Sequence, residues 1–513
     1  MTRPDAVLGI DVGTSVVKAG VFTLDGRMHA TAGRPVVLQQ PGSGRVEQDL
    51  GDLYRAAAEA TRNCLTGSTF APERIGAMAV AGQMAGVGIV DANHRPLAPY
   101  DSWLDTRCGA VVDELSGNLG GRITATAGCA PTISIGPKML WWRRHHPDVC
   151  GEAAAFVTAA GYVAGRAAGL PGDKAFIDPS YLHFTSVADV GRGRWDEDLG
   201  QAVGIDPDLL PTIVESTSII GELSARAASD FGLLAGTPVA AGCGDTAASA
   251  LGSGVTAAAQ AFDIAGTAAV FGICLPTFAP DTTHGTLMTM RAALPGRWYS
   301  LAYVGGAGQV IEWVCKEIFG HAALEDAAYA ELGAAAAEVA AGSDGLVLSP
   351  HFSGRVAPVA PALHGAVIGL SPIHRRSHLA RATLESIAFE YRRYADVAQV
   401  LVPGSSIDEV VGTGGGSRSR VWNQIKADVL GSPYRPVAGI ESGTRGAALV
   451  AMAALGHDLP ALESSASGPV VMPDAANGAA YRAAYARYHR WSDRLVDGHH
   501  SESVQSEQTG ERP

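Results

Sequence analysis

The chain has 513 residues, of which 47% are apolar and 17% charged, and its formal net charge is −13. This composition is typical of a globular protein with a large buried interior, and it excludes a chain that is disordered throughout. Single hydrophobic cores rarely serve more than about 300 residues, so the length predicts two large domains. The acidic charge, without a basic cluster, argues against nucleic acid and anionic membranes as partners.

Three features of the sequence indicate the compartment. The N-terminus has no basic segment followed by an apolar core, so no secretory signal is predicted. No apolar run reaches the roughly 20 residues that a membrane helix needs. The seven cysteines are scattered and form no CxxC pair, which is typical of reduced thiols rather than of disulfides or a zinc site. We therefore expect a cytoplasmic protein.

Strands and helices alternate along the first half of the chain. A helix is expected over residues 49–65, further helices over most of 105–170, and loops over 171–200. Short apolar runs bounded by turn residues predict strands at 6–10, 16–24, 75–81, 86–91 and 238–242. Alternation of this kind predicts an α/β architecture.

The second half repeats the opening pattern. Residues 261–267 predict an apolar strand that ends in a Gly-Thr turn, and a second apolar strand is predicted at 268–275. A repeat at half the chain length indicates an internal duplication, and hence two similar domains that face each other. The predicted units are an N-terminal domain, a C-terminal domain that ends in a helix, and a polar, disordered tail, with boundaries at 1–251, 252–495 and 496–513.

The first glycine turn, GIDVGT, combines an acid with phosphate-binding groups. Backbone N–H groups at Gly13 and the hydroxyl of Thr14 suit phosphate oxygens, and the carboxylate of Asp11 suits Mg²⁺. Lys18 could also reach a phosphate. The alternatives are an ordinary hairpin turn and a solvated strand lysine.

A second Gly-Thr turn, at Gly266 and Thr267, strengthens the phosphate hypothesis. One such hairpin could arise by chance. Two at matching positions of a duplicated fold predict a clamp around a polyphosphate, with one hairpin from each domain.

The segment AAGCGDTAAS contains the candidate catalytic acid. A buried strand leads to a glycine turn, and Asp245 and Thr246 then begin an alanine-rich helix. Phosphoryl transfer needs a base that accepts the proton of the attacking hydroxyl, and Asp245 at a domain junction could serve as that base. The alternative is a capping acid that the helix dipole favours. The two roles are compatible.

Several segments together resemble the FGGY family of carbohydrate kinases, which includes xylulose, ribulose, glycerol and gluconate kinases. GIDVGT is similar to the family's first phosphate loop, GCGDTAAS to its catalytic loop and IAGT to its second phosphate loop. The C-terminal signature and the adenosine-binding segment are matched by residues 365–370, 378–385 and 412–431. The resemblance spans residues 6 to about 455 in the family's order, so it covers nearly the whole chain.

The resemblance implies the fold, the cofactors and several residue roles. The implied fold is α/β, with two ribonuclease-H-like (actin-like ATPase) domains and an active site in the cleft between them. ATP and Mg²⁺ are the implied cofactors, with Asp245 as the base and Asp11 and Asp245 near the metal. The residues implied to contact the nucleotide are Gly13, Thr14, Lys18, Gly266, Thr267, Gly308, Glu312, Gly415 and Ser419.

Sugar contacts are implied for two further segments, AGQMAG and YDSWLDTR, and for the catalytic loop. The residues are Gln83, Met84, Ala85, Trp103, Asp105, Asp245 and Thr246. For Asp105, an ion pair with Arg107 is an equally good interpretation. Xylulose kinases usually have Met-His where this chain has Met84 and Ala85, so a hydrogen-bond partner for a sugar hydroxyl is missing. FSGRVAP at 352–358 also departs from the LSGERTP that is common in pentulose kinases.

The expected activity is therefore ATP-dependent phosphorylation of a pentulose, in the manner of a xylulose kinase. Another FGGY substrate, such as ribulose, a tetritol or another polyol, is an alternative. A catalytically silent sugar-binding protein of the same fold is a second alternative, and an actin- or chaperone-like ATPase is a third. The expected partners are a small sugar or polyol and ATP. A homodimer is considered because such kinases often form one.

Overall fold

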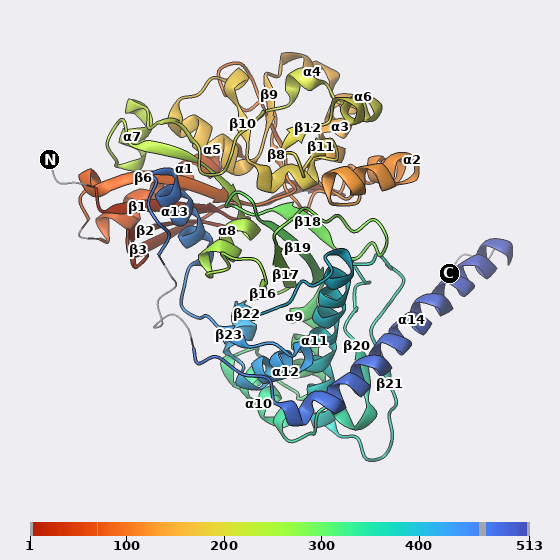
Figure 1. Cartoon of the computed structure of the whole chain (residues 1–513). Helices are drawn as coiled ribbons and strands as arrows, with labels where there is room; N and C mark the ends of the chain where they lie inside the picture. Colours follow the sequence, from red (N-terminus) through yellow and green to blue (C-terminus); the bar gives the residue numbers. More distant parts are fainter. Residues whose placement is uncertain (1–3, 69, 461–467, 510–513) are drawn as a thin grey trace.

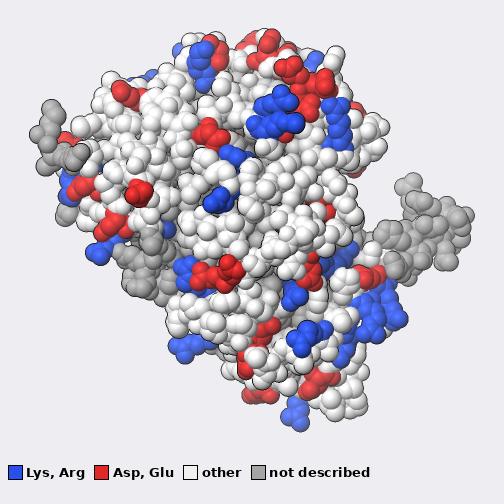
Figure 2. Space-filling view, viewed as in Figure 1, with Lys and Arg blue, Asp and Glu red and all other residues white. Residues whose placement is uncertain are grey.

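The computed structural model describes residues 4–68, 70–460 and 468–509, with side chains up to residue 496. Two lobes lie side by side, each built around one of two six-stranded sheets (Figure 1). Lys, Arg, Asp and Glu side chains form small groups of mixed sign across the face shown in Figure 2. Among the helices described, none has both the length and the apolar composition needed to cross a membrane.

The first sheet has the strand order β14-β15-β6-β1-β2-β3. β1, β2 and β3 are antiparallel neighbours, whereas β6 and β15 run parallel to β1. The strands are β1 Ala6–Val12, β2 Val16–Thr23, β3 Met28–Pro35, β6 Ile75–Gly82, β14 Ile219–Glu222 and β15 Pro238–Gly244. The predicted N-terminal hairpin and the strands that follow it are all present.

The second sheet repeats this arrangement in the order β18-β19-β17-β16-β22-β23. The series β19-β17-β16-β22-β23 corresponds to β3-β2-β1-β6-β15, with three antiparallel strands followed by two parallel ones. The strands are β16 Gln260–Ala265, β17 Ala269–Leu275, β18 Met288–Arg291, β19 Trp298–Val304, β22 Glu409–Thr413 and β23 Tyr434–Pro436. The internal repeat that the sequence predicted is thus seen as the same strand order and the same strand directions in both sheets.

Helices cover both sheets, and short strands complete the first lobe. The helices are α1 Leu50–Thr66, α2 Gly109–Ala127, α3 Ile135–His145, α4 Pro147–Glu152, α5 Ala159–Ala168, α6 Glu197–Val203, α7 Ala225–Phe231, α8 Asp245–Gly252, α9 Ala307–Trp313, α10 Asp326–Ala337, α11 Arg376–Leu401, α12 Arg420–Leu430, α13 Ser442–Ala454 and α14 Gly478–Thr509. The remaining strands are β4 Gln39–Gly42, β5 Arg45–Gln48, β7 Gly88–Val90, β8 Tyr100–Asp101, β9 Ala155–Val157, β10 Phe176–Ile177, β11 Ala188–Asp189, β12 Arg194–Trp195, β13 Thr212–Ile213, β20 Val347–Ser349 and β21 Ala366–Ile368.

Helix α13 follows the second sheet in sequence but packs on the first (Figure 1). A β-carbon at Gly9 of β1 would lie 1.9 Å from the carbonyl oxygen of Thr444, and one at Gly252 of α8 would lie 1.9 Å from that of Ser442. Glycine at both positions therefore allows α13 to approach the backbones of β1 and α8. The predicted division at 251/252 had placed this helix in the second domain, whereas the chain returns to the first lobe here.

The C-terminal helix is longer than the sequence predicted. α14 continues to Thr509, across most of the segment expected to be a disordered tail, and its last turns project away from the second lobe (Figure 1). The segment contains no proline before Pro513, so nothing in it interrupts helical hydrogen bonding. The lack of an apolar face, on which the prediction rested, does not by itself end a helix.

A buried histidine lies where the two lobes meet. His183 belongs to the 3-10 turn Pro179–Phe184, which packs against β18 of the second sheet. Burial lowers the pKa of His183 to about 3. The folded chain therefore keeps this side chain neutral, while the unfolded chain takes up a proton below about pH 6.5. The stability that His183 contributes is complete above that pH and is lost as the pH falls toward 3.

This histidine gives a testable pH dependence. Relative to His183→Asn, the free energy of unfolding of the wild type is expected to fall by about 1.4 kcal/mol between about pH 7.5 and about pH 5.5. Urea titrations of both proteins at both pH values measure the difference. His145→Asn, at an exposed histidine of α3, controls for the substitution itself. The same pH dependence in wild type and His183→Asn would contradict a neutral buried His183.

Candidate active site

Three polar side chains leave the first sheet at one edge. β1, β6 and β15 are parallel neighbours, and Asp11, Gln83 and Asp245 lie at or directly after their carboxyl ends. The carboxyl ends of parallel strands open on a common edge, which is the usual place for a ligand. The structure thus brings the predicted base, the predicted metal ligand and one predicted sugar contact to the same edge.

The pKa values of both aspartates at this edge are raised. Burial, followed by the charges of Asp245 and Glu441, raises the pKa of Asp11 to about 7, against the opposing charge of Lys18. Burial raises the pKa of Asp245 to about 6, although hydrogen bonds from Thr246 favour its ionised form. Oδ1 of Asp11 is buried and has no hydrogen-bond donor among the described residues. A donor-free carboxylate oxygen among other carboxylates fits Mg²⁺, which prefers oxygen ligands.

The N-terminus of α13 completes this part of the site. Nζ of Lys18 lies 2.7 Å from Oε2 of Glu441, the residue that precedes the helix. A β-carbon at Gly443 would lie 2.2 Å from Oδ2 of Asp11, so the helix packs directly on the carboxylate. Lys18 therefore has a carboxylate partner at the predicted phosphate site. Glu441 and Gly443 were not predicted, because nothing local in the sequence shows that α13 returns to β1.

A chain of hydrogen bonds joins the first glycine turn to the predicted sugar contacts. Nε1 of Trp103 donates to Oγ1 of Thr14 at 2.9 Å. Nε2 of Gln48 donates to the carbonyl oxygen of Thr14 at 2.9 Å, and Nε2 of Gln83 donates to Oε1 of Gln48 at 2.7 Å. The remaining oxygen of Gln83 is buried without a donor in the described part of the chain. This oxygen is thus a hydrogen-bond acceptor that no described group uses. Trp103 keeps 47% of its surface exposed, which leaves a face for stacking.

Two other predicted sugar contacts, Met84 and Thr246, lie beside the base. Met84 is 8% exposed and lies against the backbone before Asp245, since a β-carbon at Gly244 would be 2.7 Å from its sulfur. Ala85 adopts the left-handed conformation, with φ of 60°. The hydroxyl of Thr246 donates to Oδ1 of Asp245 at 3.2 Å. Except for Asp105, the predicted sugar contacts thus lie close to the catalytic edge.

Asp105 does not reach this edge. It is fully buried, and its carboxylate receives both the backbone N–H of Val46 at 2.9 Å and Nε of Arg107 at 3.0 Å. A sugar would have to displace these partners, so the ion-pair interpretation describes Asp105 and the sugar contact is not supported. The short spacing to Arg107 made the pair plausible, but the sequence could not tell which way the loop faces.

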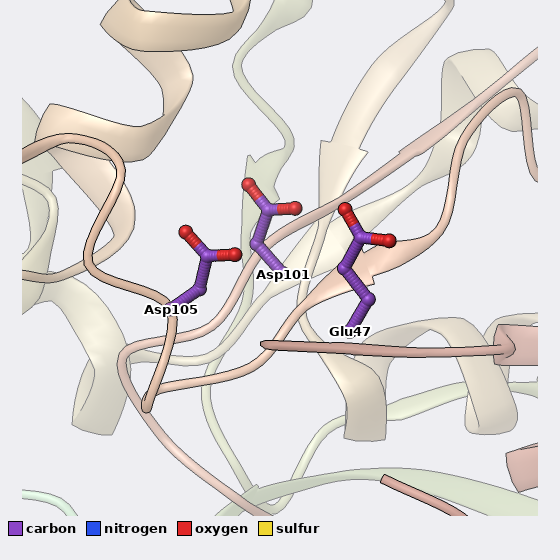
Figure 3. Close-up of side chains that lie close together, drawn as sticks. All are labelled: Glu47, Asp101 and Asp105. Atoms are coloured by element: carbon purple, nitrogen blue, oxygen red, sulfur yellow. The ribbon is translucent and has the colours of Figure 1, made fainter. Parts of the chain in front are cut away.

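Asp105 belongs to a group of three buried acids, with Glu47 and Asp101, whose carboxylates lie close together (Figure 3). Their spacing alone would suit a cation. Arg107 already occupies this position, with Nη2 at 3.0 Å from Glu47, 2.6 Å from Asp101 and 2.9 Å from Asp105. The guanidinium takes the position that a cation would need, so the three acids orient a side chain of the protein.

The second lobe contains a cavity of about 630 Å³ beside the second glycine turn. The predicted nucleotide residues that line it are Gly266, Thr267, Gly308, Glu312, Gly415 and Ser419. Asp326 and Tyr329 of α10 also line it and were not predicted, because α10 is an alanine-rich helix without a recognisable motif. The structure thus brings together, in one cavity of suitable size for a nucleoside, residues from four separate segments.

Close backbone approach shapes this cavity. The N–H of Gly308 donates to the carbonyl oxygen of Thr267 at 2.9 Å, and a β-carbon at Gly308 would be 2.8 Å from the carbonyl oxygen of Gly266. The start of α9 therefore lies directly on the second glycine turn. Gly415 differs, because a β-carbon there would meet no described heavy atom within 4 Å. It borders open space in the cavity.

The C-terminal signature and the segment 352–358 each place a buried charged side chain in the interior of the second lobe. Glu385 of the C-terminal signature accepts hydrogen bonds from the N–H of Gly342 at 2.9 Å and the hydroxyl of Ser343 at 2.8 Å. Arg355, in the segment that departs from pentulose kinases, is 7% exposed and donates to the carbonyl oxygen of Pro358 at 2.9 Å. Both side chains serve the packing of this lobe.

The sequence matches two models of one family. The N-terminal domain model of the FGGY family of carbohydrate kinases covers residues 6–252, and the C-terminal domain model covers residues 262–455. The chain is 28% identical over 494 residues to the xylulose kinase of Escherichia coli (strain K12), which covers 95% of this chain and 99% of that protein. It is 26% identical to the xylulose kinase of Bacillus subtilis (strain 168), over 87% of both chains, and 25% identical to the gluconokinase of the same organism, over 88% of both.

Solved structures give the same result for the fold. The crystal structure of xylulose kinase from Rhodospirillum rubrum superimposes with a TM-score of 0.86 at 29% identity, over 96% of this chain and all of that one. Plasmodium falciparum glycerol kinase with ADP superimposes with a TM-score of 0.82 at 18% identity, over 97% of this chain and 99% of that one, which bears on the fold alone. The predicted two-domain fold of the ribonuclease-H-like, actin-like type is confirmed.

Proposed function

Since the chain belongs to the FGGY family of carbohydrate kinases, we propose that it transfers the γ-phosphoryl group of ATP to a hydroxyl of a pentulose, in the manner of a xylulose kinase. The observation that carries the choice of a pentulose is the whole-length likeness to xylulose kinases. The gluconokinase likeness supports a second candidate substrate, a sugar acid. Ala85, at the position where xylulose kinases usually have histidine, makes a substrate other than xylulose worth testing.

Asp245 is the proposed base. Its carboxylate accepts the proton of the sugar hydroxyl as that oxygen attacks the γ-phosphorus, and the bond from phosphorus to the ADP oxygen breaks. The free oxygen of Gln83 accepts a hydrogen bond from a second hydroxyl, and Trp103 stacks on the carbon skeleton. These contacts hold the attacking hydroxyl toward Asp245, which reduces the entropy that the reaction must lose.

The cavity in the second lobe is the proposed nucleoside site, and the two Gly-Thr turns are the proposed phosphate clamp. Lys18 donates to Glu441, and its ammonium group has further N–H donors for a phosphate. Asp11 and Asp245 would hold Mg²⁺, which neutralises charge on the phosphates when it is bound. Thr14 and Thr267 would donate their hydroxyls to phosphate oxygens from opposite lobes.

ADP release with a panel of substrates tests this proposal. The panel contains xylulose, ribulose, their polyols, a tetritol, glycerol and gluconate, each with ATP and Mg²⁺. We expect the highest kcat/KM for a ketopentose. A clear preference for gluconate would reject the pentulose assignment and leave the kinase assignment intact. No turnover despite calorimetric binding of a sugar would identify a catalytically silent binding protein instead.

A further inference from the structure

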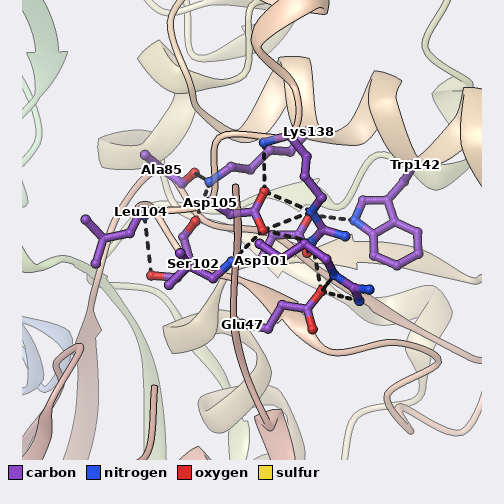
Figure 4. Close-up of polar contacts among 11 residues, drawn as sticks. Glu47, Ala85, Asp101, Ser102, Leu104, Asp105, Lys138 and Trp142 are labelled. Carbon is purple, nitrogen blue, oxygen red and sulfur yellow. Dashed lines mark hydrogen bonds and ion pairs between the residues drawn. The ribbon is translucent and has the colours of Figure 1, made fainter. Parts of the chain in front are cut away.

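Lys138 of α3 is a buried lysine that contacts two loops at once. Its side chain is 1% exposed, yet it lies in a helix that is otherwise rich in apolar residues. Nζ donates to the carbonyl oxygen of Ala85 at 3.0 Å and to that of Ser102 at 2.5 Å (Figure 4). Burial lowers the pKa of this amine to about 8, against the charges of nearby acids, which favour its protonated form. A buried ammonium group is costly unless hydrogen-bond acceptors such as these two carbonyl oxygens replace its water.

The two carbonyl groups belong to the segments that carry the proposed sugar contacts. Ala85 directly follows Gln83 and Met84, and Ser102 directly precedes Trp103. Gln83 and Trp103 lie on separate loops, which are also joined through Gln48 and Thr14. A backbone bridge between Val87 and Asp101, with N–H···O distances of 3.1 and 2.9 Å, joins the same two segments further from the sugar contacts. The ammonium group of Lys138 therefore donates a hydrogen bond to each of the two loops that would hold the sugar.

The conformation of Ala85 adds to this dependence. Its φ of 60° is unfavourable for a residue with a β-carbon, so the surroundings must hold it. The hydrogen bond from Lys138 to its carbonyl oxygen is one such restraint. Without it, the loop could relax to an ordinary conformation, which would move the neighbouring Gln83.

The charges around Lys138 are balanced by the protein itself. We call Glu47, Asp101, Asp105, Arg107 and Lys138 the buried charged cluster. Arg107 contacts all three acids, Nε1 of Trp142 donates to Asp101 at 2.6 Å, and Arg45 pairs with Glu47 at 2.8 Å. Arg107 and Lys138 within the cluster, and the half-exposed Arg45 beside it, thus supply positive charge near the three carboxylates. The cluster fixes β5 and β8, and with them the positions of Gln48 and Trp103.

We propose that Lys138 is a positioning residue for the sugar site, which sets the distance between the Gln83 and Trp103 loops. It acts through two backbone carbonyl groups and touches neither substrate. Its loss would weaken sugar binding without altering the nucleotide cavity, which lies in the other lobe. The inference rests on the proposed sugar kinase activity, because that activity assigns Gln83 and Trp103 to the sugar.

The test compares Lys138→Met with Lys426→Met. Lys426 is also a fully buried lysine, but it pairs with Asp263 at 2.5 Å in the second lobe and lies 3.8 Å from the ring of Trp422, which lines the nucleotide cavity. Both substitutions remove one buried cation. Lys138→Met is expected to raise the KM for the best sugar of the panel by about tenfold or more, with the KM for ATP within about twofold of wild type. Lys426→Met is expected to raise the KM for ATP instead.

A merely structural role for Lys138 would give a different pattern. Equal increases in both KM values for Lys138→Met, or the same profile for both variants, would overturn the proposal. Lys138→Gln, which can still donate to one carbonyl group, should give an intermediate sugar KM and serves if Lys138→Met does not fold. An unchanged sugar KM in Lys138→Gln would also overturn the proposal.

Calorimetric titration of sugar without ATP separates this proposal from the proposed function. If the wild-type protein binds a sugar of the panel but phosphorylates none, the proposed kinase activity is rejected. The role of Lys138 can still be tested in that case, by comparing the sugar Kd of the wild type with that of the Lys138 variants. An unchanged Kd in both Lys138 variants would reject the positioning role whatever the turnover.

Discussion

Asp245→Asn is expected to lower kcat by about 10³-fold, because an amide cannot accept the proton of the attacking hydroxyl. The substitution preserves the shape of the side chain at the start of α8, so the helix and the approach of Met84 to Gly244 should remain. Burial disfavours the ionised form of Asp245, and a neutral amide should therefore leave the free energy of unfolding at pH 7.5 unchanged or higher. Steady-state kinetics and urea titration measure the two effects.

Two measurements make this result specific to the proton transfer. Calorimetric titration of Asp245→Asn with ATP in the absence of Mg²⁺ should give the wild-type Kd within about threefold, since the nucleoside cavity is in the other lobe. Asp113→Asn, at an exposed acid of α2 in the same lobe, should retain wild-type kinetics. A kcat within about tenfold of wild type in Asp245→Asn would remove this residue from the role of base.

Gly415→Leu is expected to raise the KM for ATP by at least about tenfold. Gly415 lines the nucleotide cavity, and a β-carbon there meets no described atom within 4 Å. The added side chain would therefore occupy space that the nucleoside needs, without colliding with the protein. The KM for the sugar and the melting temperature should stay at their wild-type values. Kinetics with each substrate varied in turn, together with thermal unfolding, measure these quantities.

Two other glycines separate cavity filling from damage to packing. A β-carbon at Gly117, on the exposed side of α2, also meets no atom of the described residues within 4 Å, so Gly117→Leu should change neither KM. A β-carbon at Gly416 would lie 2.5 Å from the ring of Trp422 and 2.6 Å from the β-carbon of Ala265, so Gly416→Ala should lower the melting temperature. An unchanged KM for ATP in Gly415→Leu would contradict the assignment of the cavity.

Local sequence patterns predicted the parts of the molecule that depend on short segments. The two Gly-Thr turns, the acid at the start of α8 and the strand repeat all follow from residues within a few positions of one another. The resemblance to the family implied that Asp11 and Asp245 lie together near the metal, and the structure places both at the common edge of parallel strands. The glycines of the nucleotide cavity were predicted from family resemblance, and the structure brings them into one cavity.

The features that the sequence did not predict depend on contacts between distant segments. Glu441 and Gly443 reach Asp11 only because Gly9 and Gly252 let α13 approach the first sheet. Lys138 gives no signal by itself, since a single lysine in an apolar helix more often extends to solvent. The resemblance implied a sugar contact for Asp105, with an ion pair to Arg107 as an equally good interpretation, and the structure shows the ion pair.

The return of α13 to the first lobe also determines when that lobe can fold. Its sheet is assembled from residues up to 244, yet the helix that covers β1 and β6 ends at residue 454. A ribosome-bound chain that has emerged only as far as residue 251 leaves this face of the sheet bare, because its cover has not been synthesised. The first lobe is therefore completed late in translation, and its core forms through contacts of very long sequence separation, which are slow to form.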